Sequence, residues 1–541
     1  MPKIVYLIKE LHPINTREND KCDHVEEKNG IGNNLTGRGR LVPNIIFNWG
    51  GHFVFIIAGF ILPRMMDWRL GQELLGIWDF SWSLVVYFRL VGGGIASSVN
   101  RYVARYRMAG DISGVNRIVS SALCVMTMSG LLVLGLTIAV ALLLPHVFSA
   151  TLGENVHEAQ WVVFFLGASI GVEMALAAYN GVLTGCHRWG LQNIVEAGWH
   201  AVTIAGMIVA LLMSKGLRIL SLIYLIGIVL AYATRMILAY RVCEGLRVHP
   251  SLVRWETIKE QFAFGAKTLI PSISGLLLNQ TTNVLLAGYL GPAMLALYAR
   301  PRYLLLHADM LVSKMGLVLI PATSSLQSQG NMEEIRGLLM KSVRYSFYLV
   351  LPIVLVLVFF GGAIMQLWMG PRYADGVVPA ILAAGSLITM VQAPLWLILV
   401  GLNAHGRAGI AQFVASLCSA GMVFLALGFL NWGLAGVAVS ITLPLMIMNM
   451  TYLPFLICRQ VGLSVRQYFL SVTVGPVVHV LPFALCLVVA KFVFTTEPLR
   501  GLLFGGTVGS VVLAVLYYRY VLPDRIKVRL LRYGRVRGST V

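Results

Sequence analysis

Residues 300–316 read RPRYLLLHADMLVSKMG and set five ionisable side chains into an otherwise apolar segment. Apolar sequence continues on both sides, as NVLLAGYLGPAMLALYA before it and LVLIPA after it. On a helix, which turns about 100° per residue, Arg300, His307 and Lys314 fall close to one line, because they are seven residues apart. Charges inside a membrane-spanning helix are costly in lipid, so the segment predicts a transmembrane helix whose charged stripe faces protein or water.

The composition of the whole chain indicates a membrane protein. Of its 541 residues, 57% are hydrophobic and 12% are charged, against about 25% charged in a typical soluble domain. Mean hydropathy is +0.78. The net charge of +19 could indicate a nucleic-acid partner, but the Lys and Arg residues fall between apolar runs, so we predict no nucleic-acid binding. The sequence therefore predicts an all-α polytopic membrane protein.

Apolar runs of about 20 residues, the length that crosses a bilayer, predict about fourteen transmembrane helices. They lie at 44–62, 73–98, 117–145, 159–182, 191–213, 217–240, 266–290, 294–320, 343–368, 376–403, 408–430, 433–458, 468–494 and 498–521.

The distribution of positive charge predicts the orientation of these helices. With both termini inside, most of the 42 Lys and Arg residues fall in cytoplasmic segments and few fall in exterior loops, which is the usual bias. We therefore expect a multi-pass protein of the cell inner (plasma) membrane with both termini in the cytoplasm.

An internal repeat predicts two halves built to one plan. LGQELLGIW at 70–78 resembles LGPAMLALY at 290–298, and Gly110-Asp111 corresponds to Gly330-Asn331. Chance similarity between apolar helices is the alternative. Parallel repeats of this kind are typical of two-lobed transporters. The expected domains are a disordered cytoplasmic tail (1–43), an N-lobe of six helices with a cytoplasmic linker (44–255), a C-lobe of six helices (256–460), two additional helices (461–521) and a basic cytoplasmic tail (522–541).

The same stretches carry a family resemblance. LPRMMDWRLGQELLGIWDFSWSLVVYFRLVGGGIASSVNRYVARYRMAGD at 62–111 resembles the opening of the polysaccharide transporter, or O-antigen-type flippase, family. NVLLAGYLGPAMLALYARPRYLL and LIPATSSL resemble its second half. The family belongs to the multidrug/oligosaccharidyl-lipid/polysaccharide exporter superfamily. The resemblance implies two six-helix lobes around a central cavity, alternating access, and a polyprenyl-diphosphate-linked oligosaccharide as cargo. The last two helices depart from the commonest twelve-span pattern, although lipid II flippases of the superfamily also have fourteen.

Positive side chains are the candidate ligands for a diphosphate headgroup. Arginine presents a planar charged fork that matches phosphate oxygens, and lysine acts as a point charge. We predict that Arg89, Arg300, His307 and Lys314 contact the headgroup. Structural ion pairs are the alternative, with Arg302 and Asp309 as a pair or a gate, and with Arg89 paired either to Asp309 or within its own lobe.

Uncharged and acidic residues inside spans are further candidates. Asn279 and Asn283 belong to a polar run that could bind sugar hydroxyls or hydrogen-bond between helices. Glu173 and Glu196 could bind a coupling ion. The alternative, which we favour, is that both carboxylates are hydrogen-bonded by packing within the first lobe, with Arg235 as a partner.

The sequence contains no Walker loop and no HExxH motif, so we predict a protein that is not an enzyme and needs no cofactor or metal. Its seven cysteines are scattered and imply no disulfide framework. The predicted function is translocation of lipid-linked oligosaccharide, with membrane lipids and other polysaccharide-assembly proteins as further partners. The alternatives are a cation-coupled exporter of organic compounds and a membrane-embedded glycan polymerase or ligase.

Overall fold

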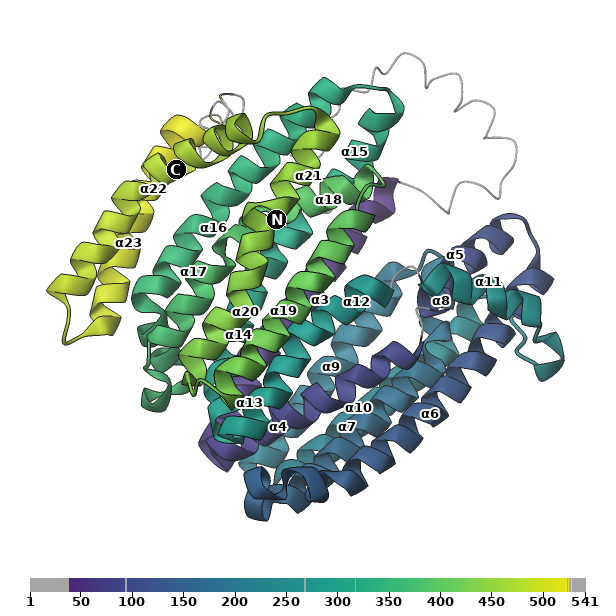
Figure 1. Ribbon diagram of the computed structural model, residues 1–541. Helices are drawn as coiled ribbons and strands as arrows, with labels where there is room; N and C mark the ends of the chain where they lie inside the picture. The colour runs from purple at the N-terminus through teal and green to yellow at the C-terminus, as the bar shows by residue number, and fades with distance from the viewer. Residues whose placement is uncertain are drawn as a thin grey trace, which may run out of the picture. The chain divides into compact units, whose positions relative to one another are not determined.

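The computed structural model (Figure 1) describes residues 38–92, 95–266, 269–316 and 318–522, together with Asp524 and Lys527. Every regular element in these residues is a helix, which confirms the predicted all-α class. Most of the predicted tails at 1–43 and 522–541 lies outside the described residues.

Ten helices in the described part of the chain are long and apolar enough to cross a membrane. One of them, Ile112–Leu176, runs through most of two predicted spans. The predicted spans at 44–62, 266–290 and 294–320 are not among the ten. The chain is a multi-pass membrane protein, and the predicted count of fourteen is not confirmed.

The helices follow one another with short connections. The first half contains α3 (Arg38–Leu70), α4 (Gln72–Val85), α5 (Ile95–Met108), α6 (Ile112–Leu152), α7 (Val156–Leu176), α8 (Ala178–Gly185), α9 (Trp189–Leu212), α10 (Leu217–Val242) and α11 (Trp255–Ala266). The second half contains α12 (Leu269–Leu276), the π-helical turn η5 (Leu277–Thr281), α13 (Thr282–Leu290), α14 (Pro292–Gly316), α15 (Leu319–Ser328), α16 (Met332–Met369), α17 (Val377–Val391), α18 (Ala393–Gly401), α19 (Gly406–Gly428), α20 (Gly433–Met450) and α21 (Tyr452–Val461). The chain ends with α22 (Val465–Val493) and α23 (Pro498–Leu516).

These helices form two compact units. Unit 1 consists of the described residues within Met1–Met65, Phe88–Leu143 and Gln160–Leu269. Unit 2 consists of the described residues within Met66–Tyr87, Leu144–Ala159 and Ile270–Val541. Helix α4 therefore belongs to the same unit as α13 and α14. The predicted lobe boundaries, 44–255 and 256–460, stay predictions.

The turns between helices repeat with the spacing that the sequence suggested. The left-handed backbone conformation, which side chains with a Cβ rarely adopt, recurs at positions 216 to 220 residues apart. The pairs are Gly71 and Gly291, Gly110 and Gly330, Gly153 and Gly370, His187 and Asn403, Ser214 and Asn431, and Gly245 and Gly462.

One pair of turns shows how closely the two halves agree in local structure. After Gly110, the side chain of Asp111 accepts a hydrogen bond from the backbone N–H of Gly114 and so caps the start of α6. After Gly330, Asn331 caps α16 in the same way through the N–H of Glu334. Both residue types are good N-caps, so the repeat is built into the residues that begin and end the helices.

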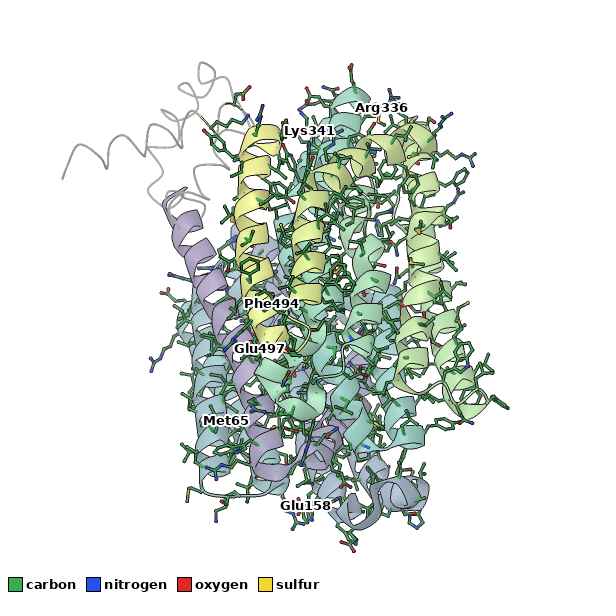
Figure 2. The ribbon with its side chains drawn as sticks, turned by 90° about the vertical axis from the view of Figure 1, so that its left-hand side faces the viewer. Met65, Glu158, Arg336, Lys341, Phe494 and Glu497 are labelled. Carbon is green, nitrogen blue, oxygen red and sulfur yellow. The ribbon has the colours of Figure 1, made fainter. Side chains whose placement is uncertain are left out.

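The two additional helices pack on α16 and on each other. Phe360 of α16 is buried against Val480, Phe483 and Leu487 of α22. Figure 2 labels Arg336 and Lys341 near the start of α16, and Phe494 and Glu497 at the turn between α22 and α23, farther along the bundle. This turn corresponds to an exterior loop in the predicted topology.

Polar contacts also attach α22 and α23 to α16. The hydroxyl of Tyr348 lies 2.7 Å from Nδ1 of His479. The hydroxyl of Tyr517, just after α23, donates to the backbone carbonyl of Tyr348. Because unsatisfied polar groups are costly in lipid, these bonds fix the register of the added pair on α16.

Gly76 allows α4 to approach the start of α14. A Cβ at this position would overlap the carbonyl oxygen of Pro292. We expect Gly76→Ala to force the helices apart and to lower stability by about 1–3 kcal/mol, the usual cost of overpacking. Thermal unfolding of the purified chain in detergent measures the change.

Gly421→Ala is the matched control, because a Cβ on this glycine of α19 meets nothing within 4 Å. Alanine is also the better helix former, so this variant should unfold at or above the wild-type temperature. Equal stability of the two variants would contradict a close contact at Gly76.

Candidate functional site

A polar seam runs along one face of α4 and the turn that follows it. We use the name α4 seam for Gln72, Gly76, Asp79, Ser83 and Tyr87, which are three or four residues apart and so share one helix face. Each of them contacts α13, α14 or η5, and all of these elements belong to unit 2.

The ends of the α4 seam are held by hydrogen bonds. At one end, the amide of Gln72 donates to the backbone carbonyl of Ala293, at 2.8 Å. At the other end, the hydroxyl of Tyr87 meets the hydroxyl of Thr281. Between Tyr87 and the centre of the seam, the side-chain amide of Asn283 donates to the hydroxyl of Ser83, at 3.0 Å.

A buried ion pair lies at the centre of the seam. The guanidinium of Arg300 donates to the carboxylate of Asp79, and the two residues are 1% and 5% exposed. The ring of Tyr303 lies 5.1 Å from the guanidinium carbon. Two buried charges in so dry a place are tolerable only because each neutralises the other.

Arg300 was predicted to contact the headgroup. In the structure its guanidinium forms an ion pair with Asp79. Asp79 was not singled out in the sequence, although the internal repeat held a signal for it. Asp79 and Arg300 are 221 residues apart, so they occupy nearly equivalent positions on the equivalent helices α4 and α14. Equivalent positions meet where two such elements pack about a two-fold axis.

A small polar pocket lies on another side of α14. Its volume is about 150 Å³, and its lining comes from Asn279, Gln280, Asn283, Tyr298, Ala299, Arg302, Tyr303, Leu306 and Ile441. All of these residues belong to unit 2. The predicted sugar-binding candidates Asn279 and Asn283 are both present, together with two tyrosines.

Arg302 is the cation of this pocket. Its guanidinium donates to the side-chain oxygen of Asn279, at 2.7 Å. Among the residues that the structure describes, no carboxylate forms a salt bridge with Arg302. A guanidinium has five N–H donors, so Asn279 satisfies only a small part of its capacity. The pocket therefore combines a permanent positive charge with neutral donors and acceptors.

The π-helical turn η5 shapes the same pocket. It carries Asn279 and Gln280, and the amide of Asn279 also donates to the backbone carbonyl of Gly275, at 2.9 Å. Single π-helical turns are rare and are frequent at functional sites. Nothing in the residue pattern indicated this widening of the helix.

The other predicted residues of α14 are not gathered into the pocket. His307 and Asp309 are partly buried, and the side chain of Lys314 lies outside the described residues. No salt bridge joins Arg302 to Asp309. Seven residues on a helix are about 10 Å apart along the axis, so this spacing places the two groups at different depths.

The predicted groups of unit 1 form two ion pairs. Arg89 donates to Glu173 at 2.8 Å, so Arg89 is paired within its own unit. Arg235 lies 3.5 Å from Glu196 and is buried, whereas the Glu196 side chain is 47% exposed. The structure thus places an arginine beside each carboxylate considered for ion coupling.

Known proteins resemble this chain in sequence. A family model described as polysaccharide biosynthesis protein matches residues 115–378. A Shigella flexneri protein named "Putative O-antigen transporter" is 20% identical over 353 residues, which cover 62% of this chain and 78% of that protein. The polysaccharide-transporter resemblance is confirmed.

Solved structures of transporters share the fold. A lipid II flippase, MurJ, in an inward closed conformation has a TM-score of 0.67 at 14% identity, over 88% of this chain and 100% of its own. An inward-facing multidrug-resistance MATE family transporter of the MOP superfamily has a TM-score of 0.62 at 16% identity, over 75% and 94%. The chain therefore has the fold of MOP-superfamily membrane transporters.

The buried pair yields a stability prediction. Asp79→Asn leaves the charge of Arg300 buried without a counter-ion, which typically costs about 3–5 kcal/mol. We expect thermal unfolding in detergent to occur at a much lower temperature in this variant than in the wild type.

Replacing both charges tests the cause of that loss. The double variant Asp79→Leu with Arg300→Met removes both charges and keeps apolar volume, so it should recover most of the stability. A double variant that is less stable than Asp79→Asn would show that something other than the uncompensated charge is at work.

Proposed function

We propose that this protein is a flippase that moves a polyprenyl-diphosphate-linked oligosaccharide across the inner (plasma) membrane by alternating access. The observation that carries the proposal is Arg302, a cation that forms no salt bridge among the described residues, in a pocket that it shares with three amide side chains and two tyrosines. The sequence and fold resemblances support the same class of transporter.

The chemistry of the pocket fits an anionic headgroup. Arg302 can offer several N–H donors to phosphate oxygens in one plane. Neutral amides and phenols nearby can replace the water that a phosphate loses on entering the membrane. A cationic organic compound, the cargo of the alternative exporter, would be repelled by Arg302, so the pocket favours an anion.

The size of the pocket limits what it holds. A cavity of about 150 Å³ has room for a few waters or a phosphate-sized group and is too small for an oligosaccharide. We therefore propose that Arg302 and Asn279 bind the diphosphate and that the sugars lie outside this pocket. Headgroup contacts by Arg89, Arg300, His307 and Lys314 stay predictions, as do coupling roles for Glu173 and Glu196.

Alternating access requires a set of contacts that separates during transport, and the contacts of the α4 seam would be that set. In the predicted topology, Gln72 lies near the exterior and Tyr87 lies deeper, so the seam closes the exterior side of the pocket. Asn283 connects the seam to the pocket, since it lines the pocket and donates to Ser83. Parting of α4 from α13 and α14 would expose the pocket to the exterior and release the cargo there.

Substitution of Arg302 tests the headgroup site. We expect Arg302→Gln to lower export of the glycan about 10- to 100-fold, the loss expected for one charged hydrogen-bonding partner, and to leave lipid-linked glycan on the inner leaflet. Arg302→Lys should retain part of the activity because it keeps the charge without the fork. Surface labelling of exported polysaccharide measures the effect.

Arg372→Gln is the control, since Arg372 is exposed in the turn after α16. It should export normally. Wild-type export by Arg302→Gln, at matched protein levels, would remove the proposed headgroup site. Efflux of a cationic dye instead of glycan export would favour the alternative exporter.

A reversible cross-link tests the opening of the α4 seam. The side chains of Ser83 and Asn283 touch, so Ser83→Cys with Asn283→Cys should form a disulfide under mild oxidation. We expect oxidation to stop export and a reductant to restore it. Each single cysteine variant, treated in the same way, should keep its activity; unchanged export by the cross-linked chain would mean that the seam stays closed throughout transport.

A further inference from the structure

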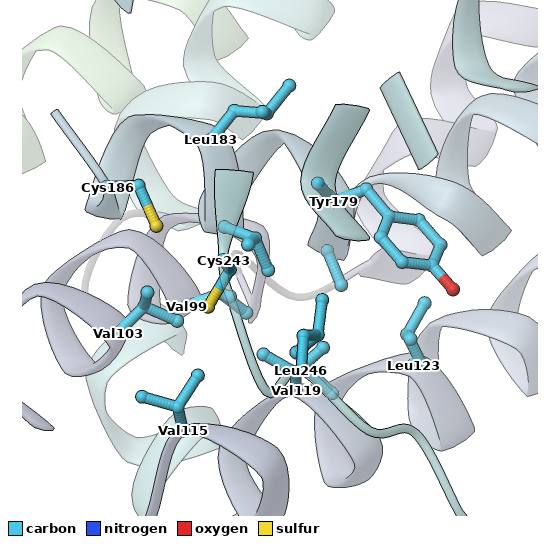
Figure 3. Close-up of a cluster of buried hydrophobic side chains, with 14 of the residues drawn as sticks. Val99, Val103, Val115, Val119, Leu123, Tyr179, Leu183, Cys186, Cys243 and Leu246 are labelled. Carbon is cyan, nitrogen blue, oxygen red and sulfur yellow. The ribbon is translucent and has the colours of Figure 1, made fainter. Parts of the chain in front are cut away.

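Two cysteines from separate helix ends lie together in unit 1. Cys186 follows α8 and Cys243 follows α10, and both belong to one buried hydrophobic cluster. Figure 3 shows both side chains in this cluster, with Val99 and Val103 beside them. The thiol of Cys243 hydrogen-bonds to the sulfur of Cys186. The scattered positions of the cysteines along the chain did not indicate this contact.

The surroundings of Cys186 favour its thiolate. Arg107 donates to the backbone carbonyl of Cys186 at 3.3 Å. The hydrogen bond from Cys243, aided by the positive charges of Arg107 and Arg188, lowers the pKa of Cys186, and burial opposes this shift more weakly. A thiolate in an electropositive place is the form that reacts with disulfides. Cys243 is the partner whose pKa is raised, chiefly by the same hydrogen bond, so it stays protonated.

Both thiols are buried, but each lies next to a surface turn. Cys186 is 3% exposed and Cys243 is 1% exposed. Their neighbours His187, Arg188 and Glu244 are exposed, so each cysteine is the last buried residue before a surface turn. Turns at helix ends open locally at low cost in free energy, and such opening would admit a small reagent.

We propose that Cys186 and Cys243 form a modification site that closes to an internal disulfide when a low-molecular-weight disulfide oxidises the pair. The Cys186 thiolate attacks one sulfur of the reagent, whose S–S bond breaks, and the leaving thiolate takes up a proton. Cys243 then loses its proton, its sulfur attacks the Cys186 sulfur of the mixed disulfide, and the second thiolate leaves. Two protein thiols are oxidised, and one small disulfide is reduced to two thiols.

The disulfide would join the end of α8 to the end of α10, next to a segment that is hydrogen-bonded to α6. The segment after Cys243 is hydrogen-bonded to α6. Asn116 of α6 donates to the carbonyl of Gly245 and accepts from the N–H of Arg247. A disulfide between Cys186 and Cys243 would therefore link α8, α10 and α6, three helices of unit 1. In the predicted topology these ends face the cytoplasm, where thiols are normally reduced, so the bond would form on oxidative stress and reverse afterwards.

The test uses the full chain in detergent with its five other cysteines changed to Ser, treated with oxidised glutathione. We expect both thiols to become resistant to maleimide labelling, and peptide mapping without reductant to join the segments that contain Cys186 and Cys243. Dithiothreitol should restore both thiols. Melting temperatures before treatment establish that each variant is folded.

Removal of one partner gives the matched control. In Cys243→Ser the reaction should stop at a glutathione adduct on Cys186, and in Cys186→Ser the remaining thiol should react far more slowly. Two thiols that stay fully labelled after treatment would overturn the proposal. So would stable glutathione adducts on Cys186 in the chain that keeps Cys243, because the resolving step would then be absent.

Discussion

The neutralisation of Arg300 by Asp79 is the constraint on which the arrangement of unit 2 depends. Neither charge could stay in this dry place alone, so α4 and α14 have to meet where the two side chains meet. Once they meet, the spacing of the α4 seam brings Gly76 against Pro292 and Ser83 against Asn283. The same contacts hold α13 and η5 beside α14, which is how amides come to share a pocket with Arg302.

The helical spacing in the sequence predicted part of the arrangement of charged residues on α14, but not the neighbours that each of them meets. It separated Arg300 from Arg302 onto different sides of one helix, and the structure gives the two arginines different surroundings. It could not say which side would face the pocket, because that depends on neighbours contributed by α4, η5 and α20. Asp79 and the π-helical turn belong to those neighbours. The apolar runs predicted the all-helical class correctly, because a membrane-spanning helix requires little beyond length and hydropathy.

The recurrence of left-handed turns explains why a weak sequence repeat could still be meaningful. Side chains on helix faces can differ between the halves, since any apolar residue satisfies a lipid-facing position. A turn that needs a positive φ is far less tolerant, so Gly71 and Gly291 keep their type. At His187 and Asn403 the residue has changed while the backbone conformation has not.

The attachment of α22 and α23 makes the two halves unequal in their freedom to vary. In α6, Leu131 and Leu142 are 64% and 65% exposed, so many apolar substitutions should be neutral there. In α16, the surface around Phe360 is covered by α22. The exposed face of α6 can therefore exchange one apolar residue for another, while the corresponding helix of the second half has to fit its added neighbours at each position.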